Sequence, residues 1–310
     1  MRYFFLINEK SRYKKFNELE EFIRGVFSQS DDEILIKRTK DLDDAKNVLA
    51  ELSLEDFNFV VGCGGDGTIN FVLNQIYGKN VSLGIIPIGT VNALARSLSF
   101  PKSIKKIVRN IRDKKTKIID VGLVNNRYFL CFASIGYDAM VTYCVPERFK
   151  ENHGKWAFIV TGVKALFKQK EIHPIRLYFR DKVGIEQCSV PTSFLLSNTP
   201  IYAGVKMFPE AKVDDGLMDL FLFKEKGVFE TVKNALIVGS IGFGLIRALL
   251  KAFPIGKNIE HIQTSTLRVE SDSDIYLQLD GEPVKIESKD SKVELNFNII
   301  KQGMKIVGVD

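Results

Sequence analysis

The sequence holds little of the material from which metal centres and disulfide scaffolds are built. Its three histidines are scattered, and its four cysteines form no Cys-x-x-Cys pair; they are Cys63, Cys131, Cys144 and Cys188. Zinc sites place such ligands at short fixed spacings, and disulfide frameworks belong to oxidising compartments. The sequence therefore predicts buried thiols in a reducing compartment and argues against a zinc enzyme or a histidine-dependent triad.

Long apolar runs are also missing. No stretch reaches the roughly 18 uninterrupted apolar residues of a membrane span. The apolar run after Met1 is too short for a signal peptide, so a cytoplasmic protein is expected. The 310 residues carry 44 basic and 38 acidic side chains, a formal net charge of +6. This mild excess fits anionic ligands or an anionic membrane surface but does not require them.

The chain is long enough for two domains. Up to about residue 122, apolar runs typical of buried strands alternate with helical patterns, which predicts a parallel sheet with helices on both faces. From Asn125 short strand candidates dominate, interrupted by helical insertions at Gly154 to Lys168 and Gly227 to Phe253. We expect a Rossmann-like α/β domain, residues 1–122 with a returning segment at about 295–310, and a mostly-β, sandwich-like domain, residues 123–294.

A glycine-rich turn lies in the middle of the first domain. Phe57 to Asn70 reads FNFVVGCGGDGTIN, an apolar strand followed by a turn and by a helix expected from Thr68 to Tyr77. Unpaired N–H groups and the helix dipole make such a turn a phosphate site. The pattern is neither G-x-x-x-x-G-K-[ST] nor G-x-G-x-x-G. A tight connection that needs glycine for steric reasons alone is the alternative.

Parallel α/β sheets bind ligands at the carboxyl ends of their strands. This rule places four segments on one edge, namely 8–12, 39–41, 62–68 and the end of the strand in 81–90. A second glycine turn, Pro87 to Thr90, leads into VNALAR. Thr90 is expected to N-cap the next helix and to offer its hydroxyl and N–H to a phosphate.

The segment from Lys102 to Lys117 contains eight basic residues and one acidic residue. Apolar residues at helical spacing predict an amphipathic helix whose basic face carries Lys105, Lys106, Arg109 and Arg112. A solvated surface helix and a contact with anionic lipid are both open. The apolar segment at 227–253 is open in the same way, between packing on the sheet and contact with lipid.

Several motifs follow one another in a characteristic order. They are GGDGTIN at 64–70, PIGTVNALAR at 87–96, Ile119-Asp120, ASIGYDA at 133–139, AKVDDGLMDL at 211–220 and DGE at 280–282. This order resembles the soluble diacylglycerol kinase-like lipid kinases, a family related to sphingosine kinases and, distantly, to NAD kinases. The likeness covers essentially the whole chain. GGDGT alone is shared with NAD kinases, and the later motifs narrow the resemblance to the lipid-kinase branch.

The resemblance implies an ATP site on the first domain. The residues carried over are Asn8, Ser11, Arg12, Thr39, Gly64, Gly65, Asp66, Gly67, Thr68, Asn70 and Thr90, with Asp66 handling the ATP-bound Mg²⁺ or orienting the phosphates. The family opening N-P-x-S-G reads Asn8-Glu9-Lys10-Ser11-Arg12 here, so its proline and glycine are absent.

The resemblance also implies a catalytic role for DGE. A carboxylate must accept the hydroxyl proton during phosphoryl transfer; this role falls to Glu282, with Asp280 as its partner. A hairpin turn in which Asp-Gly supplies positive φ is the alternative. The turn at 214–217 resembles the family's structural magnesium site, which implies Asp215 and the main chain of Lys212 and Leu217 as ligands. A plain Asp-Gly turn is the alternative there.

The sequence thus predicts a lipid kinase whose active site lies in the cleft between its domains. It would use ATP and Mg²⁺ to phosphorylate a lipid hydroxyl, as of diacylglycerol or phosphatidylglycerol. The expected partner is a lipid at a membrane surface, met peripherally at the inner face; no nucleic acid is expected, and a homodimer is open. An NAD kinase-like phosphotransferase and a catalytically inactive nucleotide-binding regulator at the membrane are the rival hypotheses.

Overall fold

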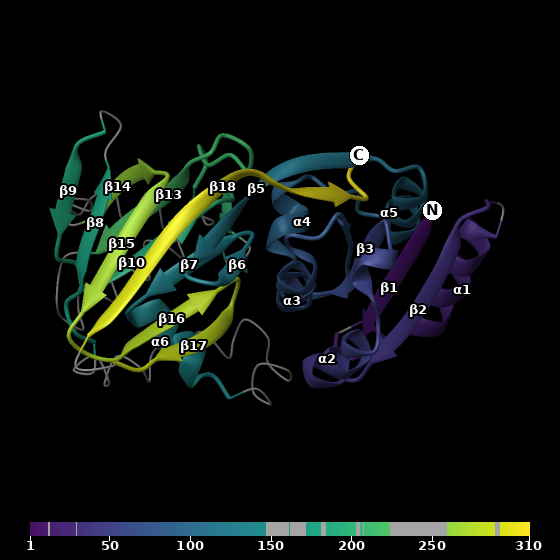
Figure 1. Cartoon of the computed structure of the whole chain (residues 1–310), viewed down its shortest axis with the longest axis horizontal. Coiled ribbons are helices and arrows are strands. Elements are labelled where there is room, and N and C mark those ends of the chain that lie inside the picture. The colour runs from purple at the N-terminus through teal and green to yellow at the C-terminus, as the bar shows by residue number, and fades with distance from the viewer. Residues whose placement is uncertain are drawn as a thin grey trace, which may run out of the picture. The chain divides into compact units, whose positions relative to one another are not determined.

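The computed structural model describes residues 1–11, 13–28, 30–146, 161, 172–180, 184–202, 205–206, 208–223, 259–288 and 292–310 (Figure 1). The chain forms two compact units. Unit 1 comprises Met1–Val121 and Lys301–Asp310, and unit 2 comprises Gly122–Ile300. The helical insertions expected at 154–168 and 227–253 lie outside the described residues, apart from Thr161.

A parallel sheet forms the centre of unit 1. Its strands run in the order β2-β1-β3-β4-β18. Their bounds are Arg2–Asn8 (β1), Glu33–Thr39 (β2), Phe59–Gly64 (β3), Ser82–Pro87 (β4) and Val293–Val307 (β18, whose end lies in this unit). All of β3 is buried, and so is β1 beyond its first residue, as expected of strands that are covered on both faces.

Helices connect these strands and cover the sheet. Their bounds are Phe16–Phe27 (α1), Leu42–Ala50 (α2), Leu54–Asp56 (the short helix η1), Asp66–Ile76 (α3), Ala93–Ser97 (α4) and Ile104–Arg112 (α5). Side chains of α1 and α5, such as Ile23 and Ile107, share a buried cluster with Phe5 and Val61 of the sheet. On the opposite face, Gly62 leaves room for Ile69 of α3.

Unit 2 contains two sheets. The first has the strand order β14-β13-β10-β7-β16-β17. The second joins β18, β15, β8 and β9, with β5 beside β18 and β6 beside β5. The bounds are Thr116–Val124 (β5), Arg127–Phe129 (β6), Phe132–Ile135 (β7), Arg176–Arg180 (β8), Glu186–Ser189 (β9), Ser193–Ser197 (β10), Met218–Phe223 (β13), Ile259–Thr264 (β14), Thr266–Ser271 (β15), Ile275–Leu279 (β16) and Glu282–Ile286 (β17). A short hairpin, β11 (Ile201–Tyr202) and β12 (Val205–Lys206), and helix α6 (Tyr137–Cys144) complete the unit.

The core of unit 2 lies between these sheets. Leu220 and Leu277 of the first sheet share one buried cluster with Leu177, Val269 and Phe297 of the second. Two sheets that bury their inner faces against each other form a β-sandwich. The predicted fold class, a parallel α/β domain followed by a sandwich-like β domain, is therefore confirmed.

One cysteine departs from the expectation of buried thiols. Cys63 and Cys131 are buried and Cys144 is half-buried, whereas Cys188 is exposed. Its strand, β9, lies at the end of the sheet order, and three of the four β9 residues are exposed. The prediction is wrong at this position because an edge strand does not bury both faces.

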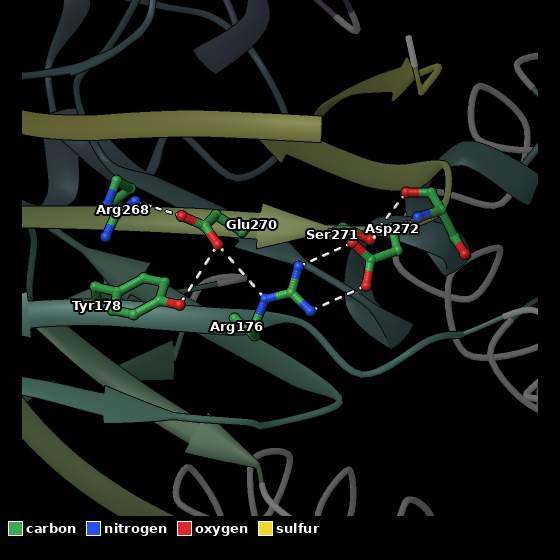
Figure 2. A network of polar contacts seen from close by, with 7 residues as sticks. Arg176, Tyr178, Arg268, Glu270, Ser271 and Asp272 are labelled. Atoms are coloured by element: carbon green, nitrogen blue, oxygen red, sulfur yellow. Dashed lines mark hydrogen bonds and ion pairs between the residues drawn. The ribbon is translucent and has the colours of Figure 1, made fainter. Parts of the chain in front are cut away.

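Polar side chains on β8 and β15 link these two strands across their surface, as Figure 2 shows. The guanidinium of Arg176 donates to both carboxylate oxygens of Asp272, at 2.9 and 2.8 Å, and to Glu270. Arg268 lies 4.1 Å from the ring centre of Tyr178 and also pairs with Glu270. Exposed ion pairs contribute roughly 0–1 kcal/mol each, so this network specifies the pairing of β8 with β15 more than it stabilises the fold.

No helix in the described part of the chain combines the length and the apolar composition that crossing a bilayer requires.

Candidate active site

The carboxyl ends of the parallel strands bring several predicted nucleotide residues of unit 1 to one sheet edge. Asn8 pairs in register with Thr39, and Gly64 with Pro87. Asn8 is buried, and its Nδ2 donates to Thr68 Oγ1 at 2.9 Å, which ties β1 to the first turn of α3. The Thr39 hydroxyl donates to the Ile7 carbonyl at 3.4 Å, so the Thr39 side chain is hydrogen-bonded to the main chain of β1.

Ser11 lies in a tight turn at the end of β1. The Ser11 N–H donates to the Asn8 carbonyl at 3.2 Å, and Asn8 Oδ1 accepts the Lys10 N–H at 3.0 Å. The Ser11 hydroxyl oxygen is buried and has no hydrogen-bond partner among the described residues. A buried polar group without a partner costs about 1–3 kcal/mol. A phosphate oxygen would accept this hydroxyl, so the site fits the nucleotide that the sequence predicts. Arg12 lies outside the described residues.

The glycines of the two turns allow close packing of main chain on main chain. A Cβ atom on Gly89 would lie 2.3 Å from the Cα of Gly65. A Cβ atom on Gly64 would lie 2.4 Å from the hydroxyl oxygen of Thr68. The steric explanation therefore applies to Gly64 and Gly89. It does not compete with phosphate binding, because the same packing places the N-terminus of α3 at the edge where the strands end.

The Asp66 carboxylate links the first glycine turn to the start of α4. Asp66 is the first residue of α3, and its Oδ1 accepts the Leu94 N–H of α4 at 3.4 Å. Burial raises the pKa of Asp66, and the backbone N–H groups of Ala93, Leu94 and Asn92 oppose that rise. The GGDGT pattern by itself does not reveal this link to α4. The contact of Asp66 with Mg²⁺ or phosphate stays a prediction.

The predicted N-cap role of Thr90 is wrong. Helix α4 begins at Ala93, and its N-cap is Asn92, in the left-handed region at φ 51°. Asn92 closes the turn before it: Oδ1 accepts the Gly89 N–H at 3.0 Å, and Nδ2 donates to the carbonyls of Gly89 and Pro87 at 3.0 and 3.2 Å. Asparagine tolerates this conformation and forms such local bonds, which is the signal that the sequence offered. Thr90 is exposed, and its phosphate contact stays a prediction.

Gly67 and Asn70 lie in the first part of α3, where both are half-buried. The side chain of Asn74 donates to the Asn70 carbonyl and to Asn70 Oδ1, at 2.9 and 3.2 Å. Asn70 is thus held along the helix, and its part in nucleotide binding stays a prediction.

The DGE motif forms the tight turn between β16 and β17 in unit 2. Leu279 pairs with Glu282, and the two residues between them have positive φ, 50° at Asp280 and 89° at Gly281. This is the backbone geometry that Asp-Gly favours in two-residue hairpins. The hairpin interpretation is therefore confirmed for the main chain.

The Asp280 side chain also forms hydrogen bonds with another segment of unit 2. Asp280 is 5% exposed, and its carboxylate accepts the N–H groups of Leu130, Cys131 and Phe132 at 2.8, 2.8 and 3.0 Å. It anchors the hairpin to the connection between β6 and β7. Glu282, in contrast, is half-buried at the start of β17. Of the two carboxylates, Glu282 is the one whose position suits an exchange of protons with a substrate.

The predicted metal residues lie in the turn before β13. Asp215 Oδ1 accepts the Leu217 N–H at 3.0 Å, and Gly216 has a φ of 79°. Asp215 and Leu217 are half-buried, and Lys212 is exposed. Within the described residues, no three His, Cys, Asp or Glu side chains gather in a group that could hold a metal. A Mg²⁺ ion here would depend on one carboxylate, main-chain oxygens and water, a donor set that this ion accepts.

Comparison with known proteins identifies the family of this chain. The diacylglycerol kinase catalytic domain matches residues 2–124. A diacylglycerol kinase of Staphylococcus haemolyticus is 32% identical over 242 residues, which cover 75% of this chain and 68% of the relative. Those of Staphylococcus saprophyticus and Bacillus subtilis are 29% and 28% identical, covering 86% and 83% of this chain and 82% and 81% of the relatives.

Solved structures share the fold. A crystal structure from Bacillus anthracis strain Sterne has a TM-score of 0.71 at 20% identity, covering 99% of this chain and 94% of the other. A second from the same strain, described as a diacylglycerol kinase, has a TM-score of 0.66 at 18% identity, covering 99% and 96%. The chain therefore belongs to the diacylglycerol kinase catalytic domain family, and it is an ATP-dependent lipid kinase.

Proposed function

We propose that this kinase transfers the γ-phosphate of ATP to the free hydroxyl of diacylglycerol or of a related lipid such as phosphatidylglycerol. The observation that carries the proposal is the DGE hairpin, in which Asp280 is locked by three backbone N–H groups while Glu282 stays half-buried beside it. The names of the relatives support diacylglycerol as the first lipid to test.

The nucleotide binds at the strand edge of unit 1. The N–H groups at the start of α3 face its phosphates, since they have no partner within the helix. The buried Ser11 hydroxyl donates to a phosphate oxygen and so gains the partner that it otherwise lacks. Asn8, held by Thr68, keeps the end of β1 close to the start of α3.

Glu282 acts as the proton acceptor. The lipid hydroxyl oxygen forms a bond to the γ-phosphorus, the bond from that phosphorus to the β–γ bridging oxygen breaks, and ADP leaves. The hydroxyl proton passes to a carboxylate oxygen of Glu282. Phosphoryl transfer depends mainly on positioning and charge stabilisation, so this role requires a fixed position of the Glu282 carboxylate. Asp280 serves by fixing the hairpin.

Mg²⁺ would be held in the turn before β13 by Asp215 and the main-chain oxygens of Lys212 and Leu217, and near the phosphates with help from Asp66. The ion supplies positive charge that stabilises the turn or the polyphosphate. Asp215 already accepts the Leu217 N–H, which shapes this turn.

The lipid partner would be met at the inner face of a membrane, and α5 offers a basic surface for that contact. Ile107, Val108 and Ile111 of this helix are buried, and the basic residues around it are exposed or half-buried. Lys106 pairs with Asp310 and Arg112 with Asp113. Lys105 and Arg109 lie over the ring of Phe22, at 5.4 and 5.5 Å from its centre. After these pairings, the segment from Lys102 to Lys117 still carries an excess of positive charge, and anionic lipid attracts such a segment.

The proposed contact is tested with vesicles of neutral lipid alone or with added phosphatidylglycerol. Lys114 and Lys115 are exposed and lie just after α5 in the same basic segment. We expect Lys114→Glu with Lys115→Glu to weaken sedimentation with the anionic vesicles, and Lys46→Glu on α2 to leave it unchanged. Equal sedimentation of the wild type, the double variant and Lys46→Glu with the anionic vesicles would contradict the contact.

The proposed activity is tested with labelled ATP and separate acceptors, namely diacylglycerol, phosphatidylglycerol and NAD. We expect a phosphorylated lipid that disappears in Glu282→Gln but persists in Glu287→Gln, an exposed glutamate beyond the same strand. Labelled NAD without labelled lipid would favour an NAD kinase-like activity. Nucleotide binding without transfer to any acceptor would favour an inactive regulator.

A further inference from the structure

A partly buried polar cluster adjoins the DGE hairpin and takes no part in the mechanism described so far. Its centre is Asp138, the second residue of α6. Asp138 Oδ2 accepts hydrogen bonds from Ser134 Oγ at 2.5 Å and from Gln278 Nε2 at 3.1 Å. The other carboxylate oxygen, Oδ1, accepts the hydroxyl of Tyr202. Three neutral donors from three different strands therefore converge on one carboxylate.

Gln278 connects this cluster to the hairpin. Its Oε1 accepts the N–H of Gly281 at 2.7 Å, and Gly281 stands between Asp280 and Glu282. The Gln278 side chain is 1% exposed, and Ser134 is fully buried. A backbone N–H can only donate, so the amide oxygen of Gln278 must face Gly281 and its nitrogen must face Asp138. The direction of every bond from Asp138 to the hairpin is thereby fixed.

The chemistry of Asp138 fits an acceptor of all three bonds. An ionised carboxylate only accepts, and in a half-buried position it needs hydrogen bonds or a cation to offset the loss of water. No basic side chain of the described residues forms an ion pair with it; hydroxyl and amide donors take that place. Burial and the charge of Asp138 raise the pKa of Tyr202 well above its ordinary range, so Tyr202 stays a donor.

We propose that Asp138 and Gln278 are positioning residues for Glu282. Asp138 holds the Gln278 amide, Gln278 holds the Gly281 N–H, and the fixed turn sets the place of the Glu282 carboxylate. Asp280, the first residue of the same turn, is fixed by the hydrogen bonds that its carboxylate accepts from the N–H groups of residues 130–132. A turn of two residues with both residues tied has little freedom left, which is what a pre-organised catalytic group requires. The inference rests on the proposed role of Glu282.

Exchanging the amide of Gln278 and the carboxylate of Asp138 between these two positions tests the proposal. Gln278→Glu still accepts the Gly281 N–H but turns its second oxygen toward Asp138, so that two acceptors face each other. We expect kcat to fall about 10- to 100-fold, as for a misplaced catalytic group. The KM for ATP should stay unchanged, because Gln278 forms its bonds with Asp138 and Gly281 and not with the residues proposed to bind ATP. Adding Asp138→Asn supplies an amide donor to the carboxylate introduced at position 278, and we expect this double variant to regain most of the lost turnover.

Single variants sharpen the interpretation. Asp138→Asn alone should lose less turnover than Gln278→Glu, because the Tyr202 hydroxyl can turn and accept from the new amide. If Gln278→Glu keeps wild-type turnover, or if the double variant is no more active than Gln278→Glu, the positioning role is wrong. It is equally wrong if the lost activity returns on cooling the assay well below the thermal midpoint of the variant, because the loss then reflects unfolding alone.

Glu282→Gln, measured in parallel, separates this inference from the proposed function. If Glu282→Gln retains turnover, the proposed proton acceptor is wrong. If Glu282→Gln is inactive while Gln278→Glu is fully active, only the positioning role fails. In the Glu282→Gln background, Gln278→Glu should cause no additional loss of the residual rate, because Gln278 acts through Glu282; a further large loss would contradict that pathway.

Discussion

Replacing Asp280 with alanine should strongly destabilise unit 2, apart from any effect on catalysis. The Asp280 carboxylate accepts the N–H groups of Leu130, Cys131 and Phe132 in a position that is 5% exposed. Asp280→Ala removes the acceptor that these three groups share, and since each lost bond to a buried donor costs about 1–3 kcal/mol, the total is about 3–9 kcal/mol. This is a large part of the about 5–15 kcal/mol that holds an ordinary domain folded.

The three bonds also predict a graded series. Asp280→Asn keeps the oxygen that serves Cys131 and Phe132 but puts an N–H group against that of Leu130, which costs about 1–3 kcal/mol. Asp272→Asn, a control on an exposed ion pair with Arg176, should cost at most about 1 kcal/mol.

Urea unfolding followed by circular dichroism measures this series, and hydrogen exchange of the amides at 130–132 locates it. At about 2–4 °C of thermal shift per kcal/mol for a unit of this size, Asp280→Ala should melt at least about 6 °C below the wild type. An Asp280→Ala protein that unfolds with the wild type and keeps these amides protected would refute the reasoning.

Further predictions concern the strand edge of unit 1 at which we propose that the nucleotide binds. Gly89→Ala places a Cβ 2.3 Å from the Gly65 Cα, so we expect a loss of about 1–3 kcal/mol in urea unfolding and a higher KM for ATP, whereas Gly25→Ala, which meets open space on α1, should show neither. Ser11→Ala removes a buried hydroxyl without a described partner, so the protein without nucleotide should not lose stability while ATP binds more weakly in calorimetry; a destabilised variant with normal ATP affinity would contradict this. Burial raises the pKa of Asp66 above its ordinary 3.8, so ionisation makes the wild type progressively less stable as pH rises from about 3.8 through the raised value. The stability of Asp66→Asn relative to the wild type should therefore increase over that interval, and a difference that does not change with pH would speak against a raised pKa.

Local patterns were sufficient to predict the elements of unit 1 and part of its site. Buried parallel strands appear as apolar runs, and parallel pairing then brings Asn8, Thr39 and Gly64 to one edge whatever the details of the helices. The same reasoning misplaced the start of α4. Thr90 has the right chemistry for an N-cap, but Asn92 adopts the left-handed conformation and closes the turn two residues later.

The contacts that organise the DGE hairpin could not be predicted from a local pattern. Asp280 accepts N–H groups about 150 residues earlier in the chain, and Gln278 reaches Asp138 about 140 residues earlier. An Asp-Gly pair shows that a tight turn is favourable, but not that its aspartate will anchor another segment. Such partners depend on how the strands of unit 2 are ordered, which a single sequence leaves open.

Strand β18, which crosses from unit 2 into unit 1, has a consequence for how this protein is made. Unit 1 is discontinuous: Ile306 of β18 pairs with Leu83 of β4, and the Gly308 N–H donates to the Lys115 carbonyl. A ribosome that has released residues 1–121 has therefore not yet released the strand that completes their sheet. Until then β4 presents an unpaired edge, which is where nascent sheets aggregate. Unit 1 begins first and is completed last, so unit 2 has the opportunity to fold as an insertion within it.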